Sequence, residues 1–210
     1  MLSCQSEHKS TIEPEYPVQN KDCISKAEGY FERFGYRISN YFIVSSHKSY
    51  DLNNDGVSDS IAILTPLELA PRNPFCERKD DGIVEDRLLV INLMEKDGSI
   101  AESHLYEKVI SNKKSWATKQ GGEYIAFFEN YPGLVLFQDY GQACYVKYYI
   151  YVKHHEGHDF VVDSLVYKTK CPRDAQETVR RQELPQNPLP LEKYNREYLV
   201  PFKKEHGIIK

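Results

Sequence analysis

Residues 143–170 read ACYVKYYIYVKHHEGHDFVVDSLVYKTK. Aromatic and β-branched residues fill both halves of this stretch, and such residues favour half-buried positions in a β-sheet. The polar residues 154–159 separate the two halves. The stretch therefore predicts a long hairpin, with strands at 143–153 and 159–170.

The same hairpin predicts a disulfide. Reflection about the middle of the turn places Cys144 opposite Thr169, two residues short of Cys171, and a small register offset or a β-bulge would bring the two cysteines together. We therefore predict a Cys144–Cys171 disulfide, which leaves Cys23–Cys76 as the second pair by elimination. The alternative is a cytoplasmic protein in which these four cysteines are reduced.

Shorter patterns continue the strand prediction outward from the hairpin. Aromatic, β-branched and leucine residues predict further strands at 36–46, 60–67, 87–94, 123–128 and 133–137, and residues 102–112 fit either a strand or a helix. A short helix is expected at 22–34, ending at Gly35, and another at 191–205. The pattern predicts a mainly β fold, an antiparallel sandwich or curled barrel with one or two short helices.

The composition indicates one polar, β-rich domain. The 210 residues are 40% hydrophobic and 28% charged with a formal net charge of −4, which does not indicate a nucleic-acid-binding surface. Sixteen tyrosines and nine phenylalanines stand against one tryptophan, which favours pleated surfaces. We expect a flexible tether at 1–20 and a single domain at 21–171. The proline-punctuated tail at 172–210 either packs on that domain or extends to a partner.

One loop has the spacing of a calcium site. Ca²⁺ takes six to eight oxygen ligands, and alternate side chains of a tight loop can converge on it. A glycine at the sixth position permits the sharp turn, because it has no Cβ to oppose a positive φ. The predicted ligands are the side chains at positions 1, 3, 5 and 9 and the backbone carbonyl at position 7, namely Asp51, Asn53, Asp55, Asp59 and Val57.

The loop departs from a helix–loop–helix calcium motif. Position 12 would hold a bidentate glutamate in that motif, and here it is Ala62. The loop lies between two predicted strands, so we expect Ca²⁺ to stabilise the strand–loop–strand unit and not to take part in catalysis. The alternative is a solvated Asn-Asp-Gly turn.

The first residues resemble the end of a bacterial lipobox. Met1-Leu2-Ser3 precedes Cys4, which would carry the lipid, and a polar segment with prolines follows it. We therefore predict a periplasmic or outer-membrane lipoprotein of the bacterial cell envelope, in contact with the membrane only through this anchor.

Taken in order, these features resemble a known family. The lipobox-like start, the calcium loop, the strand that begins at Arg87, the Gly121-Gly122-Glu123-Tyr124 segment and the tyrosine-rich hairpin are similar to periplasmic lysozyme-inhibitor-like, calcium-binding immunity proteins. The resemblance covers roughly residues 36–170. It implies a β-sandwich-like fold, no catalysis, and a protruding Ser-Gly-x-Tyr loop that blocks the cleft of a lysozyme-type hydrolase. Gly122 and Tyr124 match that loop, whereas Gly121 stands where the family has serine.

The sequence therefore predicts a calcium-stabilised, exported binding protein that inhibits a peptidoglycan hydrolase. A different class of function stays open, that of an envelope structural or adhesive protein that binds glycan or protein through its tyrosines. A glycosidase that uses carboxylates such as Glu85 and Asp86 is the third alternative.

Overall fold

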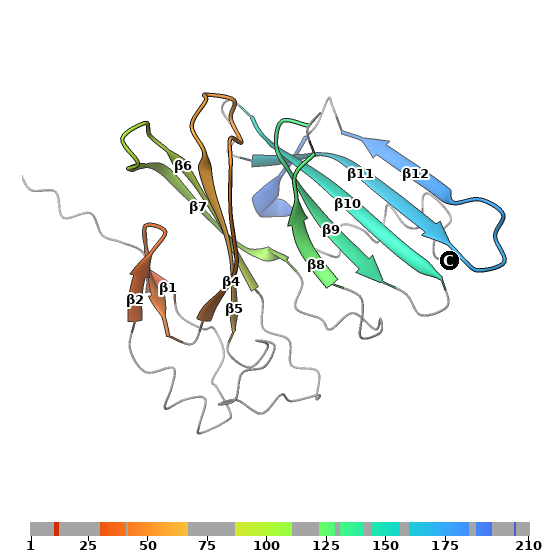
Figure 1. Cartoon of the computed structure of the whole chain (residues 1–210), viewed down its shortest axis with the longest axis horizontal. Coiled ribbons are helices and arrows are strands. Elements are labelled where there is room, and N and C mark those ends of the chain that lie inside the picture. The colour runs from red at the N-terminus through yellow and green to blue at the C-terminus, as the bar shows by residue number, and fades with distance from the viewer. Residues whose placement is uncertain are drawn as a thin grey trace, which may run out of the picture.

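The computed structural model describes residues 11–12, 30–40, 42–66, 87–110, 122–128, 131–140, 144–155, 160–184, 188–194 and 204. These residues form three β-sheets, which we call sheets A, B and C (Figure 1). Cys4, Cys23, Cys76 and Gly121 lie outside the described residues, as do Glu85 and Asp86. Two residues of the predicted tether, Thr11–Ile12, form strand β1.

Sheet A is a small hairpin with one added strand. Strand β2 (Tyr30–Arg33) pairs antiparallel with β3 (Tyr36–Ser39), and β1 pairs parallel with β3. The prediction of a helix through residues 30–34 is therefore wrong. Phe34 and Gly35 have φ of 54° and 78°, and two adjacent positive φ angles make a two-residue hairpin turn and not a helix end.

Sheet B consists of four antiparallel strands in the order β4-β5-β6-β7. The predicted strands at 60–67 and 87–94 are confirmed, and residues predicted as one strand at 36–46 are divided between β3 and β4. The ambiguous segment at 102–112 contributes to β7. The strands are β4 (Phe42–Tyr50), β5 (Asp59–Pro66), β6 (Arg87–Met94) and β7 (Ile100–Ile110).

Sheet C contains the long hairpin and reaches into the tail. Its strands are β8 (Gly122–Ala126), β9 (Leu134–Tyr140), β10 (Tyr145–His154), β11 (Phe160–Lys170) and β12 (Thr178–Glu183), and a short strand β13 (Leu189–Pro190) also pairs with β11. Strands β12 and β13 were not predicted, and they show that the described part of the tail packs on the sheet. Within the predicted terminal helix, Leu191–Lys193 form a 3₁₀ turn, η2.

Sheet B is covered on both faces. Ile61, Ile63, Leu89 and Ile91 point into a core shared with sheet C, where they meet residues such as Leu136 and Ile150. The alternate residues Ala62, Leu64, Leu88 and Val90 point the other way and pack with Ile38 of sheet A. The period-2 alternation of a strand produces this division. The fold is thus an antiparallel sandwich, and in the described chain the sheets do not close into a barrel.

The hairpin confirms the predicted disulfide between Cys144 and Cys171. Val152 pairs with Val162 but Tyr151 pairs with Ser164, so a β-bulge inserts Asp163 as an extra residue on β11. The bulge shifts the register so that Tyr145 pairs with Lys170, which leaves the two cysteines directly opposite each other.

Candidate functional site

The Asp-rich loop connects β4 to β5 at the edge of the main core. Tyr50 pairs with Asp59, so the loop closes a hairpin of sheet B. Leu52 is 1% exposed and lies in the core shared with sheet C, which anchors the beginning of the loop. Asn54 and Gly56 have φ of 61° and 85°, and no atom lies within 4 Å of a Cβ built on Gly56. Glycine at this position therefore serves the backbone conformation and not a close contact.

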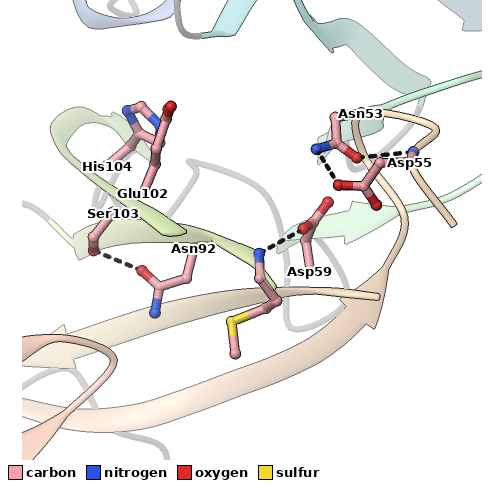
Figure 2. Close-up of polar contacts among 8 residues, drawn as sticks. Asn53, Asp55, Asp59, Asn92, Glu102, Ser103 and His104 are labelled. Carbon is pink, nitrogen blue, oxygen red and sulfur yellow. Dashed lines mark hydrogen bonds and ion pairs between the residues drawn. The ribbon is translucent and has the colours of Figure 1, made fainter. Parts of the chain in front are cut away.

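The polar side chains of the loop are turned inward on its own backbone. Asp51 Oδ2 accepts a hydrogen bond from the Gly56 N–H at 3.0 Å, and Asp55 Oδ1 accepts from the Val57 N–H at 2.7 Å. Asn53 Oδ1 accepts from the Asp55 N–H at 3.2 Å, and Asn53 Nδ2 donates to Asp55 Oδ2 at 2.8 Å (Figure 2). The side-chain oxygens at positions 1, 3 and 5 (Asp51, Asn53 and Asp55) thus all accept N–H groups of the same short loop, which agrees with the convergence that their spacing predicts.

Asp59 has a second role that the sequence did not indicate. Its buried carboxylate accepts the Leu52 N–H on Oδ2 at 2.8 Å and the Met94 N–H on Oδ1 at 3.0 Å, so it ties the loop to the end of β6 (Figure 2). Burial raises the pKa of Asp59 above its usual value, the two backbone N–H groups act in the opposite direction, and the charges of Asp55 and Asp51 raise it further.

The chemistry of these donors fits a hard cation. Asp51 Oδ1 is buried and has no hydrogen-bond partner, which is a costly state for a carboxylate oxygen. A cation at this oxygen would satisfy it and would offset the repulsion among the three aspartates. Within the described ranges, no three His, Cys, Asp or Glu side chains are arranged as a ready metal site. Ca²⁺ binding therefore stays a prediction, with Asp51, Asn53, Asp55, Asp59 and the Val57 carbonyl as the proposed ligands.

An open cavity of about 530 Å³ lies beside this loop. It is lined by Asp55, Val57, Met94, Glu95, Lys96 and Asp97, so the turn between β6 and β7 forms its second wall. Asp97 Oδ1 accepts hydrogen bonds from the Ser99 N–H at 2.9 Å and the Ser99 hydroxyl at 2.6 Å, and these bonds lower the pKa of Asp97. Carboxylates from two separate turns therefore border the same hollow.

The Gly-Gly-x-Tyr segment does not form the protruding loop that the resemblance implies. Gly122 and Tyr124 belong to strand β8, where Gly122 pairs with Asp139 and Tyr124 pairs with Phe137. The glycines therefore precede or begin a strand, and Tyr124 occupies a position in sheet C. Strand β8 lies at one edge of that sheet. Insertion of a loop that presents Tyr124 into an enzyme cleft is thus not supported.

The sequence suggested a contact surface made of tyrosines but did not locate it; the structure shows a cluster of aromatic rings on sheet C. The rings of Phe137 and Tyr149 lie 4.9 Å apart edge to face, and Tyr131 meets Tyr151 at 5.0 Å in the same way. Phe128, 41% exposed, lies 6.4 Å from Tyr149 and 6.3 Å from Tyr151. We call these five rings the aromatic face. Phe137 is buried, with 4% exposure, whereas Tyr131, Tyr149 and Tyr151 are half-buried. The residues that alternate with them along β9 and β10, such as Leu136 and Ile150, point to the core.

A partly buried hydrogen bond fixes one end of the aromatic face. The bulge residue Asp163 accepts the Tyr131 hydroxyl at 3.0 Å and pairs with Lys153 Nζ at 3.3 Å. Burial, followed by the charge and hydrogen bond of Asp163, raises the pKa of Tyr131. A Cβ on Gly133 would meet the Val152 carbonyl oxygen at 2.2 Å, so only glycine fits beneath this turn.

Cations lie over several of these rings. Lys147 Nζ is 5.8 Å from the centre of the Phe137 ring, Lys168 Nζ is 5.3 Å from that of Tyr149, and the Arg181 guanidinium is 5.8 Å from that of Tyr151. The alternation was visible in the sequence: Tyr145, Lys147, Tyr149 and Tyr151 occupy every second position of β10, while the residues between them fill the core.

No helix among the described residues is both long and apolar enough to cross a membrane.

No protein-family model, curated protein or solved structure matches this chain. The similarity to lysozyme-inhibitor-like immunity proteins therefore stays a prediction from the motifs.

Proposed function

We propose that this chain is an exported, calcium-stabilised binding protein that acts without catalysis and contacts a glycan or a protein of the bacterial envelope. The observation that carries the proposal is the aromatic face, which combines half-exposed tyrosine rings with a rigid sheet. Aromatic side chains with a polar tip are enriched at recognition surfaces, because they supply a large contact area at low conformational-entropy cost. Lipid attachment at Cys4 would hold this surface at the membrane.

The aromatic face is held in place by the strand pairing of sheet C and, at one end, by a hydrogen bond. Tyr149 and Tyr151 belong to β10, which pairs on both sides along most of its length. The Tyr131–Asp163 hydrogen bond fixes the turn between β8 and β9 against β11. A surface held in this way needs little reorganisation on binding, which favours affinity.

Inhibition of a lysozyme-type hydrolase is the more specific form of this proposal. With Gly122 and Tyr124 inside β8, the inhibitor would cover the enzyme's cleft with a sheet edge and the adjoining aromatic face. An adhesive role toward glycan would use the same rings. Both forms therefore predict that loss of Tyr149 and Tyr151 abolishes binding.

A retention experiment tests the proposed function. Immobilised protein is presented with purified peptidoglycan, lysozyme and a soluble acidic polysaccharide, and lysozyme activity is assayed alongside. The Tyr149→Ala/Tyr151→Ala variant should lose whichever ligand the wild type retains. The matched control is Tyr30→Ala, which removes an exposed tyrosine from sheet A. Retention of none of the three, or equal retention by the double variant, would overturn the proposal.

Calcium binding is tested separately by stability. At a Ca²⁺ concentration about 100-fold above the dissociation constant, a site in the folded state alone adds about 2.7 kcal/mol to the free energy of unfolding. The Asp51→Asn variant keeps an oxygen that can accept the Gly56 N–H but replaces the carboxylate oxygen that has no hydrogen-bond partner. The increase in the free energy of unfolding caused by Ca²⁺ should therefore disappear, while the stability without metal should stay the same. Asp97→Asn, in the neighbouring turn, is the control. If Ca²⁺ does not change the free energy of unfolding of the wild type, the loop is a turn without a calcium site and the prediction is wrong.

A further inference from the structure

The Asp-rich loop of sheet B and the end of β8 in sheet C lie next to each other (Figure 1). The ring of Tyr50, the residue before the loop, stacks on the ring of Phe127, the residue after β8, with the ring centres 4.5 Å apart. Both side chains are half-buried and pack against the main core. A defined ring contact therefore joins the two sheets at this point.

The segment that follows β8 is held mainly by its side chains. The pairing of β8 with β9 ends at Ala126, which lies opposite Val135. Beyond it, the Phe128 carbonyl accepts the Tyr131 N–H at 2.9 Å and closes a turn. The positions of Phe127 and Phe128 therefore depend on the contacts of their rings more than on the strand ladder.

The two phenylalanines contact different parts of the molecule. Phe127 packs against the main core and Tyr50, whereas Phe128 is 41% exposed and lies beside the rings of Tyr149 and Tyr151. They are adjacent in the chain, so a backbone shift at Phe127 moves Phe128 with it. Release of the Phe127 ring would thus loosen Phe128 from the rest of the aromatic face.

The loop is connected to Tyr50 by a short route. Gly56 donates its N–H to Asp51 Oδ2 at 3.0 Å, and Asp51 directly follows Tyr50. Tyr50 also pairs with Asp59, whose carboxylate accepts the Leu52 N–H at 2.8 Å. The order of the loop therefore decides how firmly the Tyr50 ring is held.

We infer that the Asp-rich loop controls the position of Phe128, and through it one end of the aromatic face, by means of the Tyr50–Phe127 stack. The inference rests on the proposed function, because it treats the aromatic face as the contact surface. An aromatic pair changes an equilibrium by about two- to tenfold beyond the effect of its buried area. Loss of the stack, or disorder of the loop, should shift the equilibrium between held and released Phe128 by about that factor.

Two glycines allow the loop to be disturbed with a matched control. Gly56 in the loop and Gly98 in the turn between β6 and β7 have φ of 85° and 84°, and no atom lies within 4 Å of a Cβ built on either. Alanine at either position therefore introduces similar backbone strain and no new contact. Gly56 donates to Asp51, whereas Gly98 donates to the Glu95 carbonyl at 2.9 Å within its own turn.

A fluorescent reporter at position 128 tests the inference without a ligand. Phe128→Trp is combined with Trp116→Phe, which leaves one tryptophan in the chain, and its fluorescence anisotropy decay is recorded on the nanosecond timescale with a chelator present. Gly56→Ala should increase the ratio of mobile to immobile reporter by about two- to tenfold, and Gly98→Ala should leave it unchanged. Tyr50→Leu should act as Gly56→Ala does, while Tyr50→Phe, which keeps the ring, should have no effect.

The combination of two substitutions shows whether the stack carries the effect. In the Tyr50→Leu background, Gly56→Ala should add nothing, because the connection is already broken. An additional increase there, equal responses to Gly56→Ala and Gly98→Ala, or no response to Tyr50→Leu would overturn the inference. The comparison of Tyr50→Leu with Tyr50→Phe does not depend on the loop variants and tests the stack by itself.

The retention assay separates this inference from the proposed function. When the wild type retains one of the three ligands and Tyr149→Ala/Tyr151→Ala does not, Gly56→Ala should weaken that retention by about two- to tenfold and Gly98→Ala should not. Equal retention by the wild type and Gly56→Ala would overturn the inference while the proposed function stands. If the reporter responds as expected but no ligand is retained, the proposed function fails and the coupling between the loop and Phe128 stands.

Discussion

Replacement of Asp59 by alanine should destabilise the protein even without metal. The carboxylate accepts two backbone N–H groups, from Leu52 at 2.8 Å and Met94 at 3.0 Å, and it is 0% exposed. Each hydrogen bond to a charged acceptor contributes about 1.5–3 kcal/mol, so the pair contributes about 3–6 kcal/mol. Removal of a buried charge that Asp51 and Asp55 repel offsets part of this loss. We expect a net decrease of about 2–4 kcal/mol.

The assay is urea unfolding followed by far-UV circular dichroism, with a chelator present. The same loss corresponds to a decrease in melting temperature of about 4–16 °C for a chain of this size. Asp97→Ala is the matched control, because that carboxylate also accepts a backbone N–H but is exposed; its effect should be much smaller. A decrease below about 1 kcal/mol for Asp59→Ala, or one equal to that of the control, would refute the claim that Asp59 ties the loop to β6.

Three further predictions concern sheet C. Reduction of the Cys144–Cys171 disulfide should lower the free energy of unfolding by about 3.5 kcal/mol, because it reopens a loop with a sequence separation of 27; denaturation with and without reductant measures this. Gly133→Ala should cost about 2–6 kcal/mol through a clash with the Val152 carbonyl and a φ of 154°, and a wild-type melting curve would contradict it. Because Tyr131 keeps its proton when folded, stability should fall by about 1.4 kcal/mol per unit as pH rises above 10.0, and Tyr131→Phe should reduce that slope.

The strands that the sequence predicted are those with the most apolar content. Strand β6 reads RLLVINLM, and its six central residues are buried, as expected for a strand covered on both faces. Strand β12 reads TVRRQE and has five exposed residues out of six, so no hydrophobic pattern indicates it. Charged residues on an edge strand oppose pairing with other chains. The same charged residues leave β12 without the alternating apolar pattern from which a strand is predicted.

The helix prediction failed because of a turn with an unusual residue. Two-residue hairpin turns are usually indicated by Asn-Gly or Asp-Gly, whereas this one is Phe34-Gly35. The Ser103 hydroxyl on β7, which donates to Asn92 Oδ1 at 2.6 Å, lies 3.4 Å from the Phe34 carbonyl oxygen, and Gly35 lies against Ile100. Contacts with a distant strand therefore contribute to a conformation that local propensity does not favour.

The loop was predictable in its local geometry and unpredictable in its long-range contacts. The spacing of Asp51, Asn53 and Asp55 is enough to bring their oxygens to one turn, as the hydrogen bonds within the loop show. The bond from Met94 to Asp59 joins residues 35 apart in sequence, and it depends on how β5 pairs with β6. That register is a property of the whole sheet and cannot be inferred from the motif.

The Asp-rich loop and the aromatic face lie on different sheets, and a contact between a residue next to the loop and a residue next to the face connects them. Tyr50, the residue before Asp51, stacks on Phe127 with ring centres 4.5 Å apart and planes 18° from parallel. Phe127 in turn precedes Phe128, the most exposed ring of the aromatic face. A cation that orders the loop would therefore restrict Tyr50, and through it the residues after β8, Phe127 and Phe128. Since linkage is reciprocal, a ligand that holds Phe128 would also strengthen the binding of the cation.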